Sequence, residues 1–385
     1  MYTRLLPLPE RTFFLFGPRG TGKTTWLRAQ LPKAMWFDLL RTQEYLALLR
    51  DPAHLRMQVE ALPKGSWVVV DEVQRIPALL DEVHSLIADH GTRYRFALSG
   101  SSARKLRRMD TNLLAGRAIQ RQFFPLTSAE LDYRFDVDDL LAFGSLPGVR
   151  SEPEHAVDIL EAYVGTYLQQ EIRQEALVKD LQSFARFLDI ASLMNGEVVN
   201  VSAIARDAGV ARPTVQRYFD TLVDTLIGAW LPAWRPRRKV KEVAHPKFFL
   251  FDTGVARALQ RRLRDPIEGA ERGHLLETLV FHELRAAISI QNIGGDLAYW
   301  RTPTKSEVDF VWSRGKTVVG IEVKASTTWR PEFGNAVQEM LAEGLVQSGF
   351  GVYLGREPLR TKGLDVLPLE DFLRRLHNGE VLARS

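Results

Sequence analysis

The feature that most constrains this sequence is an apolar run leading into a glycine-rich loop. Residues 13–16 read FFLF, and the loop that follows fits the pattern G-x-x-x-x-G-K-[ST] from Gly17 to Thr24. In such a loop, successive backbone N–H groups surround one anion, and the next helix adds its positive N-terminal end. Gly20 and Gly22 let the backbone approach that anion without a Cβ in the way. We therefore expect a buried strand, a phosphate-binding loop and a helix.

The residues of this loop have expected roles in binding a nucleotide. Lys23 would reach the β- and γ-phosphates, and the hydroxyl of Thr24 would coordinate Mg²⁺. The loop thus predicts a nucleoside triphosphate and Mg²⁺ as cofactors. The residues expected to contact the nucleotide are Gly17, Pro18, Arg19, Gly20, Thr21, Gly22, Lys23, Thr24 and Thr25.

A second apolar run, at residues 67–70, ends in the carboxylates Asp71 and Glu72. A continuous apolar run is typical of a central parallel strand that is covered on both faces. In open α/β sheets, ligands bind at the carboxyl ends of the strands. We expect Asp71 to hold the Mg²⁺ shell and Glu72 to polarise the attacking water. An acidic turn in solvent is the alternative for this segment taken alone.

Further strands and a helix are expected around these two motifs. Residues 34–38 read as a buried strand, 41–50 as an amphipathic helix and 118–124 as an edge strand. A strand over residues 94–101 ends in small hydroxyl residues. Ser99 and Ser101 are both candidates to contact the γ-phosphate, and a simple strand-to-turn exit is an equal alternative.

Length and composition limit the class of protein. A chain of 385 residues is too long for one ordinary core, so we expect two or three domains. No apolar run reaches the ~18–20 residues that span a bilayer, and the N-terminus has no signal-peptide core. The sequence has no cysteine, which excludes disulfides and thiolate metal sites. These features favour a cytoplasmic protein without a membrane partner.

Residues 201–218 are similar to a helix-turn-helix. Ser202 is placed to cap the first helix, Gly209 lies at the turn and Pro213 suits the first turn of the second helix. A basic run at residues 235–241 would form a wing, which makes DNA the expected partner. A winged helix used as a protein–protein module is the alternative. The expected DNA contacts are Arg212, Thr214, Gln216, Arg217, Arg237, Arg238 and Lys239.

The C-terminal part carries a set of acidic and basic residues on predicted strands. Asp309 lies on a strand at residues 307–312, which a turn at 313–316 joins to a strand at 318–325, so the two should pair as a hairpin. Glu322 and Lys324 are two residues apart and share one face of the second strand. Two carboxylates and a lysine at a hairpin can hold a divalent metal and orient a water. An exposed Glu-Lys pair on an edge strand is the alternative.

The loop, the acid-ended strand, the serine-ended strand and the segment Leu-Ala-Gly-Arg at residues 114–117 together resemble the AAA+ class of P-loop ATPases. More narrowly, they resemble a prokaryotic family with an AAA+ module and a C-terminal domain of undefined function. The resemblance implies a homo-oligomer, a hexamer-type ring, in which each ATP site receives an arginine from a neighbouring subunit. Arg117 is the first candidate for that arginine, and Arg150 and Arg173 are weaker ones.

The C-terminal spacing resembles the PD-(D/E)xK restriction-endonuclease-like superfamily. That resemblance implies that Asp309 and Glu322 are metal ligands, that Lys324 stabilises the pentacoordinate phosphate, and that Glu277 is the helix acid. The chain departs from the pattern at Val308, where the superfamily often has proline. Such folds also survive as DNA-binding or packing domains without cleavage.

These predictions combine into an α/β fold class. We expect an AAA+ P-loop core with a parallel sheet at residues 1–128, a helical lid at 129–180, a winged helix-turn-helix at 181–242 and a nuclease-like α/β domain at 243–385. The expected function is ATP hydrolysis coupled to action on DNA, in remodelling, repair, recombination or defence. The alternative is an ATP-gated switch that binds a promoter or a protein partner and has an inactive nuclease-like domain.

Overall fold

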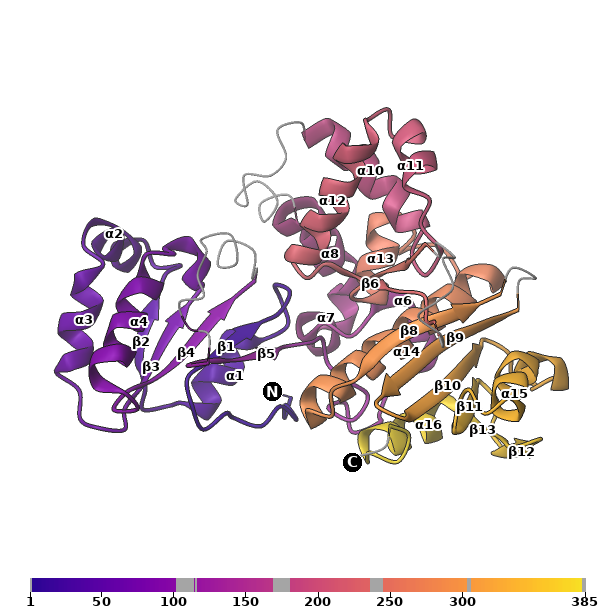
Figure 1. The fold of residues 1–385 in the computed structure, drawn as a ribbon. Helices are drawn as coiled ribbons and strands as arrows, with labels where there is room; N and C mark the ends of the chain where they lie inside the picture. The colour runs from indigo at the N-terminus through magenta and orange to yellow at the C-terminus, as the bar shows by residue number, and fades with distance from the viewer. Residues whose placement is uncertain are drawn as a thin grey trace. The chain divides into compact units, whose positions relative to one another are not determined.

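The computed structural model describes residues 2–101, 114, 116–168, 181–235, 245–302 and 306–382, with the backbone alone at 166–168 and 181. The chain divides into two compact units. The N-terminal unit comprises residues 4–124 with 224–226, and the C-terminal unit comprises residues 125–223 and 227–385 with the first three residues. Figure 1 shows the elements of each unit.

The N-terminal unit is built on a five-stranded sheet in the order β2-β3-β4-β1-β5. Its strands are β1 (Phe13–Phe16), β2 (Met35–Asp38), β3 (Trp67–Asp71), β4 (Arg95–Gly100) and β5 (Ile119–Gln122). Every neighbouring pair is parallel. The strands predicted at 34–38, 67–70 and 94–101 are confirmed, and β5 is an edge strand as expected. The carboxyl ends of all five strands therefore meet at one edge of the sheet.

Helices cover both faces of this sheet, which explains the continuous apolar runs. On one face, Phe14 and Phe16 share a core with α2 (Thr42–Arg50), α3 (Ala53–Glu60) and α4 (Leu79–His90). On the other face, Phe13 and Leu15 pack against Trp26 and Leu27 of α1 (Lys23–Gln30). The strand residues are buried whichever face they point to, as the sequence predicted for a two-sided parallel sheet.

Helix α2 forms where it was predicted, but its apolar side chains do not all face the core. Leu48 is buried, whereas Leu46 and Leu49 are 54% and 51% exposed. The side chain that enters the core is set by the position of α2 against the sheet, and a nine-residue helix has too few residues for its pattern to fix that position.

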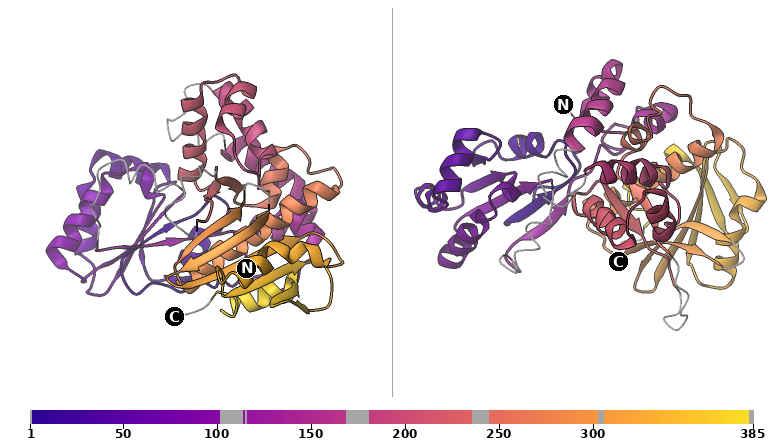
Figure 2. Two further views of the ribbon diagram at one scale, coloured as in Figure 1. Left: turned by 45° about the vertical axis from the view of Figure 1, so that its right-hand side comes forward. Right: turned by 90° about the horizontal axis from the view of Figure 1, so that it is seen from above.

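The C-terminal unit begins with a group of helices, shown in Figure 2. The helices and helical turns of this group are α6 (Val137–Phe143), α7 (Pro147–Ser151), a 3₁₀ turn η3 (Pro153–His155), α8 (Ala156–Ala162), a π-helical turn η4 (Tyr163–Leu168), α10 (Leu181–Leu193), α11 (Val201–Asp207), α12 (Arg212–Asp224) and α13 (Thr253–Leu259). One aromatic cluster joins α10, α12 and the strands that follow, with Phe187 edge-on to Phe219 at 4.9 Å between ring centroids.

A short antiparallel sheet follows α12. Strand β6 (Gly228–Leu231) pairs with β7 (Lys247–Leu250), and isolated bridges join residues 195 and 198 to β7. The boundary expected at residue 243 falls between these two paired strands. The pairing could not be read from the sequence, because β7 alone looks like the first strand of whatever follows it.

The rest of the unit is a six-stranded mixed sheet in the order β12-β13-β11-β10-β9-β8. Its elements are α14 (Gly269–Gln291), β8 (Asp296–Arg301), β9 (Glu307–Arg314), β10 (Thr317–Lys324), η5 (Pro331–Gly334), α15 (Asn335–Ala342), β11 (Ser348–Tyr353), β12 (Leu359–Thr361), β13 (Leu364–Pro368) and α16 (Leu369–His377). Helices α14 and α16 share a core with one face, and α15 packs on the other. The hairpin of β9 and β10 is confirmed, and β10 is a central strand. Among the described residues, no helix is long and apolar enough to cross a membrane.

Candidate functional site

The glycine-rich loop lies between β1 and α1 at the carboxyl edge of the parallel sheet. Gly20 and Gly22 both have positive φ angles, 79° and 89°, which side chains rarely adopt. Gly22 is the N-cap of α1 and contributes no capping side chain. The first N–H groups of α1 therefore lack a side-chain acceptor from the cap, as a phosphate site at a helix N-terminus requires.

The buried ammonium of Lys23 is held inside the loop. Its Nζ donates to the carbonyl oxygens of Gly17 at 2.7 Å and Pro18 at 3.0 Å. Thr21 closes the same turn, because its Oγ1 donates to the Pro18 carbonyl at 2.8 Å. The lysine thus lies against the ring of backbone groups that would surround a phosphate.

Gly17 is a glycine for a steric reason. A Cβ at this position would lie 2.3 Å from the carbonyl oxygen of Phe123, a distance that no real Cβ contact reaches. The backbone N–H of Gly17 donates to the Gly100 carbonyl at 3.3 Å, and Phe123 N–H donates to the Phe16 carbonyl at 2.7 Å. The start of the loop is therefore fixed between the ends of β4 and β5.

Asp71 accepts a hydroxyl hydrogen bond at each of its two oxygens. Thr24 Oγ1 donates to Asp71 Oδ2 at 2.7 Å, and Ser99 Oγ donates to Oδ1. The Thr24 hydroxyl comes from the first turn of α1 and the Asp71 carboxylate from the end of β3, and they meet where a Mg²⁺ ion would need both. The structure thus brings these three predicted residues together.

Glu72 and Ser101 are linked through a residue that the sequence analysis did not single out. Gln74, in the 3₁₀ turn η1 (Val73–Arg75), donates from Nε2 to Glu72 Oε2 at 2.5 Å and to Ser101 Oγ at 3.1 Å. The two candidate serines therefore serve different partners: Ser99 contacts Asp71, and Ser101 contacts Gln74. The signal in the sequence was Gln74 itself, a buried amide two residues after the second acid.

The three arginine candidates have different surroundings. Arg117 is exposed and lies two residues before the start of β5. Arg150 is paired with Asp139, with its Nη1 3.4 Å from Oδ2 and its side chain only 11% exposed. Arg173 lies outside the described residues.

Helices α11 and α12 are joined at Gly209, whose φ is +66° as a turn glycine requires. Arg212, Gln216 and Arg217 are exposed on α12, and Thr214 is half-buried. The predicted cap is wrong: Asn200, not Ser202, is the N-cap of α11, and its Oδ1 accepts from the N–H groups of residues 202 and 203 at 3.1 Å. Arg237, Arg238 and Lys239 lie outside the described residues.

The C-terminal acidic and basic residues form one cluster at β9, β10 and α14. Lys324 pairs with Glu322 and lies 3.7 Å from Asp309 Oδ2, which also accepts from the Val323 N–H at 2.8 Å. Glu322 Oε2 is buried and has no hydrogen-bond partner among the described residues. Glu277 lies close enough for its charge to act on Glu322 and Lys324.

Two further residues, Lys247 and Glu307, complete this cluster and were missed in the sequence. Lys247, the first residue of β7, lies with Nζ 2.6 Å from Glu307 Oε1 and 3.5 Å from Glu277 Oε2, and its side chain is 6% exposed. A lone lysine at a strand start gives no signal of burial, because its partners lie 30 residues and more away in the sequence.

Burial and crowded charges shift the proton affinities of the cluster. Burial, helped by the neighbouring charge of Asp309, raises the pKa of Glu277 to about 8 and raises the pKa of Glu322 well above its ordinary value. Burial by itself lowers the pKa of Lys247 and of Lys324, but the surrounding carboxylates more than offset it and raise both. The lysines are therefore charged at neutral pH.

Metal binding by this cluster is restricted by its own lysines. Within the described ranges, no group of three or more His, Cys, Asp or Glu side chains is arranged to hold a metal ion. Asp309 and Glu322 are nevertheless oxygen donors of the type that Mg²⁺ prefers, and Glu322 Oε2 has an open acceptor. The donor set fits a two-carboxylate metal site in which Lys324 would have to move aside.

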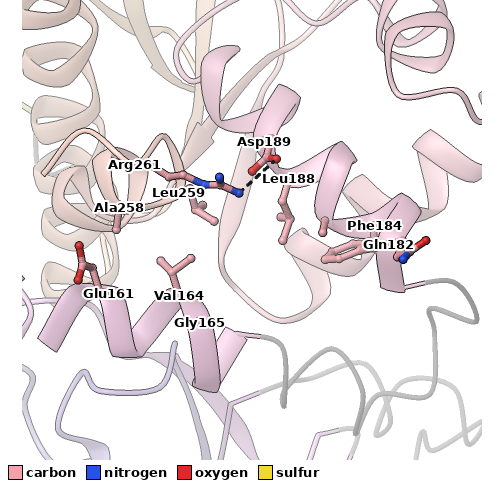
Figure 3. A pocket seen from close by; sticks show the side chains of 11 residues that line it. Glu161, Val164, Gly165, Gln182, Phe184, Leu188, Asp189, Ala258, Leu259 and Arg261 are labelled. Carbon is pink, nitrogen blue, oxygen red and sulfur yellow. Dashed lines mark ion pairs between the residues drawn. The ribbon is translucent and has the colours of Figure 1, made fainter. Parts of the chain in front are cut away.

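A cavity of about 410 Å³ lies elsewhere in the C-terminal unit, between α8, α10 and α13. Figure 3 shows its lining, with the ion pair of Arg261 and Asp189 at 3.9 Å. The lining is largely apolar, with Phe184 and Leu188 on one side. None of the predicted site residues lines it.

Three family models match successive parts of the chain. Residues 9–131 match an AAA domain, residues 134–265 a domain of unknown function (DUF8612) and residues 272–372 a second domain of unknown function (DUF4143). Uncharacterized proteins of Mycobacterium tuberculosis and Mycobacterium bovis are each 28% identical over 341 residues, which cover 86% of this chain and 73% of theirs. An uncharacterized protein of Haemophilus influenzae is 23% identical over 275 residues, 67% of this chain and 65% of its own.

Solved structures with detectable likeness include a RuvB variant of Thermotoga maritima, which is 18% identical and has a TM-score of 0.30 over 58% of this chain and 82% of its own. A protein of Vibrio cholerae is 10% identical with a TM-score of 0.23 over 95% and 96%. These scores are too low to assign a fold. The assignment depends instead on the loop at Gly17, the parallel sheet around it and the family match. Together they identify residues 9–131 as an AAA-type P-loop domain.

Proposed function

We propose that this chain is a Mg²⁺-dependent ATPase whose hydrolytic site is the edge of the parallel sheet around Lys23, Asp71 and Glu72. The observation that carries the proposal is the hydrogen bond of 2.7 Å between Thr24 Oγ1 and Asp71 Oδ2. A hydroxyl from the loop and a carboxylate from β3 are two of the oxygen donors that P-loop enzymes offer to Mg²⁺. Two motifs 47 residues apart in the sequence thus converge on one point.

Each residue has one task in this reaction. Bound Mg²⁺ would neutralise charge on the β- and γ-phosphate oxygens. Lys23 would leave the carbonyl oxygens of its own loop and pair with those phosphates. The first N–H groups of α1 would donate hydrogen bonds to the same phosphates. Glu72 would orient and polarise the attacking water, and Ser99 would hold Asp71 in place through its second oxygen.

ATP turnover by the purified full-length chain tests the proposal. We expect Mg²⁺-dependent hydrolysis that Lys23→Ala removes through loss of nucleotide binding and that Glu72→Gln removes while ATP still binds. Binding of a fluorescent ATP analogue separates the two effects. A chain that ignores adenine nucleotides and Mg²⁺ in calorimetry would refute the proposal.

An arginine from a second copy of the chain is proposed to complete each site. Arg117 is supported by its exposure, whereas Arg150 is less suitable because Asp139 already neutralises it. We expect Arg117→Ala to reduce kcat and leave ATP affinity unchanged, and mass measurement with ATP to show a homo-oligomer of ring type. Mixing Arg117→Ala with Lys23→Ala should restore part of the turnover. At some interfaces, the Arg117→Ala copy supplies an intact loop and the Lys23→Ala copy supplies an intact Arg117.

DNA is the proposed macromolecular partner. The support is a helix pair with a turn glycine, an exposed basic face on α12 and a short antiparallel sheet after it, which together have the element order of a winged helix. Duplex, single-stranded and junction DNA should each be tested for binding and for stimulation of ATP turnover. If one consensus sequence binds without raising turnover, an ATP-gated regulatory switch is the better description.

A second candidate function, cleavage or binding of DNA by the C-terminal sheet, is favoured by the orphaned Glu322 Oε2 beside Asp309 and Lys324. Asp309 and Glu322 would hold a divalent ion and Lys324 would stabilise charge on the phosphate, with Glu277 as the helix acid. Incubation with Mg²⁺ or Mn²⁺ and plasmid or branched DNA tests cleavage. Cutting that persists in Asp309→Ala and Lys324→Ala would exclude these residues.

A further inference from the structure

The second acid of the proposed ATPase site, Glu72, contacts the side-chain amide of Gln74. Gln74 Nε2 lies 2.5 Å from Glu72 Oε2 and 3.1 Å from Ser101 Oγ, so one NH₂ group uses its two protons on two different partners. Gln74 is 7% exposed and Ser101 is 2% exposed. The amide therefore connects the carboxylate after β3 to the hydroxyl after β4 in a place largely closed to water.

The packing around Gln74 leaves the amide little freedom. Its Oε1 is buried without a hydrogen-bond partner among the described residues. A Cβ built on Gly100 would lie 2.5 Å from that oxygen and 3.3 Å from the amide carbon. Gly100 is thus the residue type that lets the glutamine side chain lie across the end of β4.

The backbone of Glu72 has an unusual conformation. Its φ is +61° and its ψ is 43°, the left-handed region that a glutamate rarely occupies. That turn directs the chain out of β3 into the 3₁₀ turn that carries Gln74 two residues later. Because the turn is short, the Gln74 amide lies against the Glu72 carboxylate, so one local backbone conformation positions both side chains.

We propose that Gln74 is a positioning residue of the hydrolytic step, whose amide fixes the Glu72 carboxylate and joins it to Ser101 at the end of β4. The inference rests on the proposed ATPase function. A carboxylate that must orient a water works only from a narrow range of positions. Gln74 restricts the rotation of Glu72 and couples its position to the strand end that borders the phosphate site.

The test is ATP turnover by the full chain carrying Gln74→Met, which keeps the length and approximate volume of the side chain and removes both donors. We expect kcat to fall by about 10- to 100-fold, the scale of one lost hydrogen bond to a charged group. KM for ATP and the affinity for a fluorescent ATP analogue should stay within about twofold, because the hydrogen bonds of Gln74 go to Glu72 and Ser101. Gln43→Met, an exposed glutamine-to-methionine change on α2, is the matched control and should leave both parameters unchanged.

Two further variants separate positioning from a structural role. Gly100→Ala leaves Gln74 in the chain but pushes its amide away, and it should lower kcat in the same direction; it also serves where Gln74→Met fails to fold. In the background of Gln74→Met, which keeps measurable turnover, adding Ser101→Ala should cause no further loss, since Ser101 acts on Glu72 only through the Gln74 amide.

Three results would overturn the inference: an unchanged kcat in Gln74→Met, a raised KM with kcat intact, or losses that multiply when Ser101→Ala is added to Gln74→Met. These outcomes differ from failure of the ATPase proposal. In that case the unaltered chain itself shows no Mg²⁺-dependent turnover, and both proposals are refuted together.

Discussion

Thr24 Oγ1 donates a hydrogen bond of 2.7 Å to Asp71 Oδ2, so the last hydroxyl of the glycine-rich motif contacts the carboxylate at the end of β3. The second oxygen of Asp71 accepts from Ser99. The carboxylate is thus oriented from both sides by hydroxyl groups. We therefore expect substitutions of the residues around Asp71 to change different kinetic parameters, either the Mg²⁺ dependence of turnover or kcat.

Ser99 and Ser101 should give different defects. Ser99→Ala removes the group that orients Asp71, so we expect the Mg²⁺ concentration for half-maximal turnover to rise about 10-fold, as when a partner of a metal ligand is lost. Ser101→Ala weakens only the Gln74 contact and should lower kcat with the Mg²⁺ dependence unchanged. Turnover titrated with Mg²⁺ checks both. Equal Mg²⁺ dependence in the two variants would contradict the separation.

Gly17→Ala should abolish nucleotide binding. The new Cβ would lie 2.3 Å from the Phe123 carbonyl oxygen, so the loop or the end of β5 must shift, and the phosphate-binding N–H groups shift with it. Gly273→Ala is the control: its Cβ meets nothing within 4 Å on helix α14, where alanine is favoured over glycine. Fluorescent ATP analogue binding is the measurement. Wild-type affinity in Gly17→Ala would show that the loop adapts.

Arg217→Ala should weaken DNA binding about equally for all sequences and reduce the slope of log affinity against log salt by roughly one. The reason is the loss of one phosphate contact from the exposed face of α12. Arg261, which is 83% exposed and follows the end of α13, supplies the matched control as Arg261→Ala. Fluorescence anisotropy at several salt concentrations measures both. Identical slopes for the two variants would exclude α12 as the contact surface.

Lys247→Met should destabilise the C-terminal unit by about 2 kcal/mol, because it removes the buried cation that lies 2.6 Å from Glu307 and leaves that half-buried carboxylate with Arg301 at 3.6 Å. Adding Glu307→Gln to the same chain should recover part of the loss by removing the charge of that carboxylate. Urea unfolding followed by fluorescence gives the comparison. If the single variant is as stable as the unaltered chain, the pairing contributes nothing.

The pH dependence of Glu283 has a definite sign. Its carboxylate accepts from the Ser128 N–H at 2.7 Å and lies 2.6 Å from His377 Nε2. Burial alone raises the pKa of Glu283, but the His377 hydrogen bond and charge outweigh burial, so the pKa lies below its ordinary value. Because the folded pKa is depressed, this stabilisation is present above the ordinary carboxyl pKa of about 4.3 and is lost as pH falls below it.

Glu283→Gln should therefore unfold at a lower temperature than the unaltered chain at pH 7, with a destabilisation of about 2 kcal/mol. The difference should shrink as pH falls below about 4, where the carboxylate of the unaltered chain also loses its charge. Thermal unfolding across that pH range is the measurement. A difference that stays constant with pH would show that the charge of Glu283 is not what stabilises this contact.

The sequence by itself determined the glycine-rich loop, the positions of the parallel strands along the chain and the hairpin of β9 and β10. These features depend on local physics. Glycines at positive φ, as at Gly20 and Gly22, and apolar runs of strand length constrain the backbone within a few residues of themselves. For the same reason the candidate acids Asp71 and Asp309 were found at strand positions, while their roles stay predictions.

Only the tertiary structure decided which groups meet. Ser99 and Ser101 look alike in the sequence, yet Ser99 donates to the Asp71 carboxylate and Ser101 accepts from the Gln74 amide. The reason is that Ser99 lies within β4, beside β3, whereas Ser101 follows the end of β4 and lies beside the η1 turn. Lys247 joins Glu277 and Glu307 only because β7 pairs with β6 and lies beside α14. Contacts between residues so far apart in the chain depend on strand pairing and helix packing, which no local pattern of residues specifies.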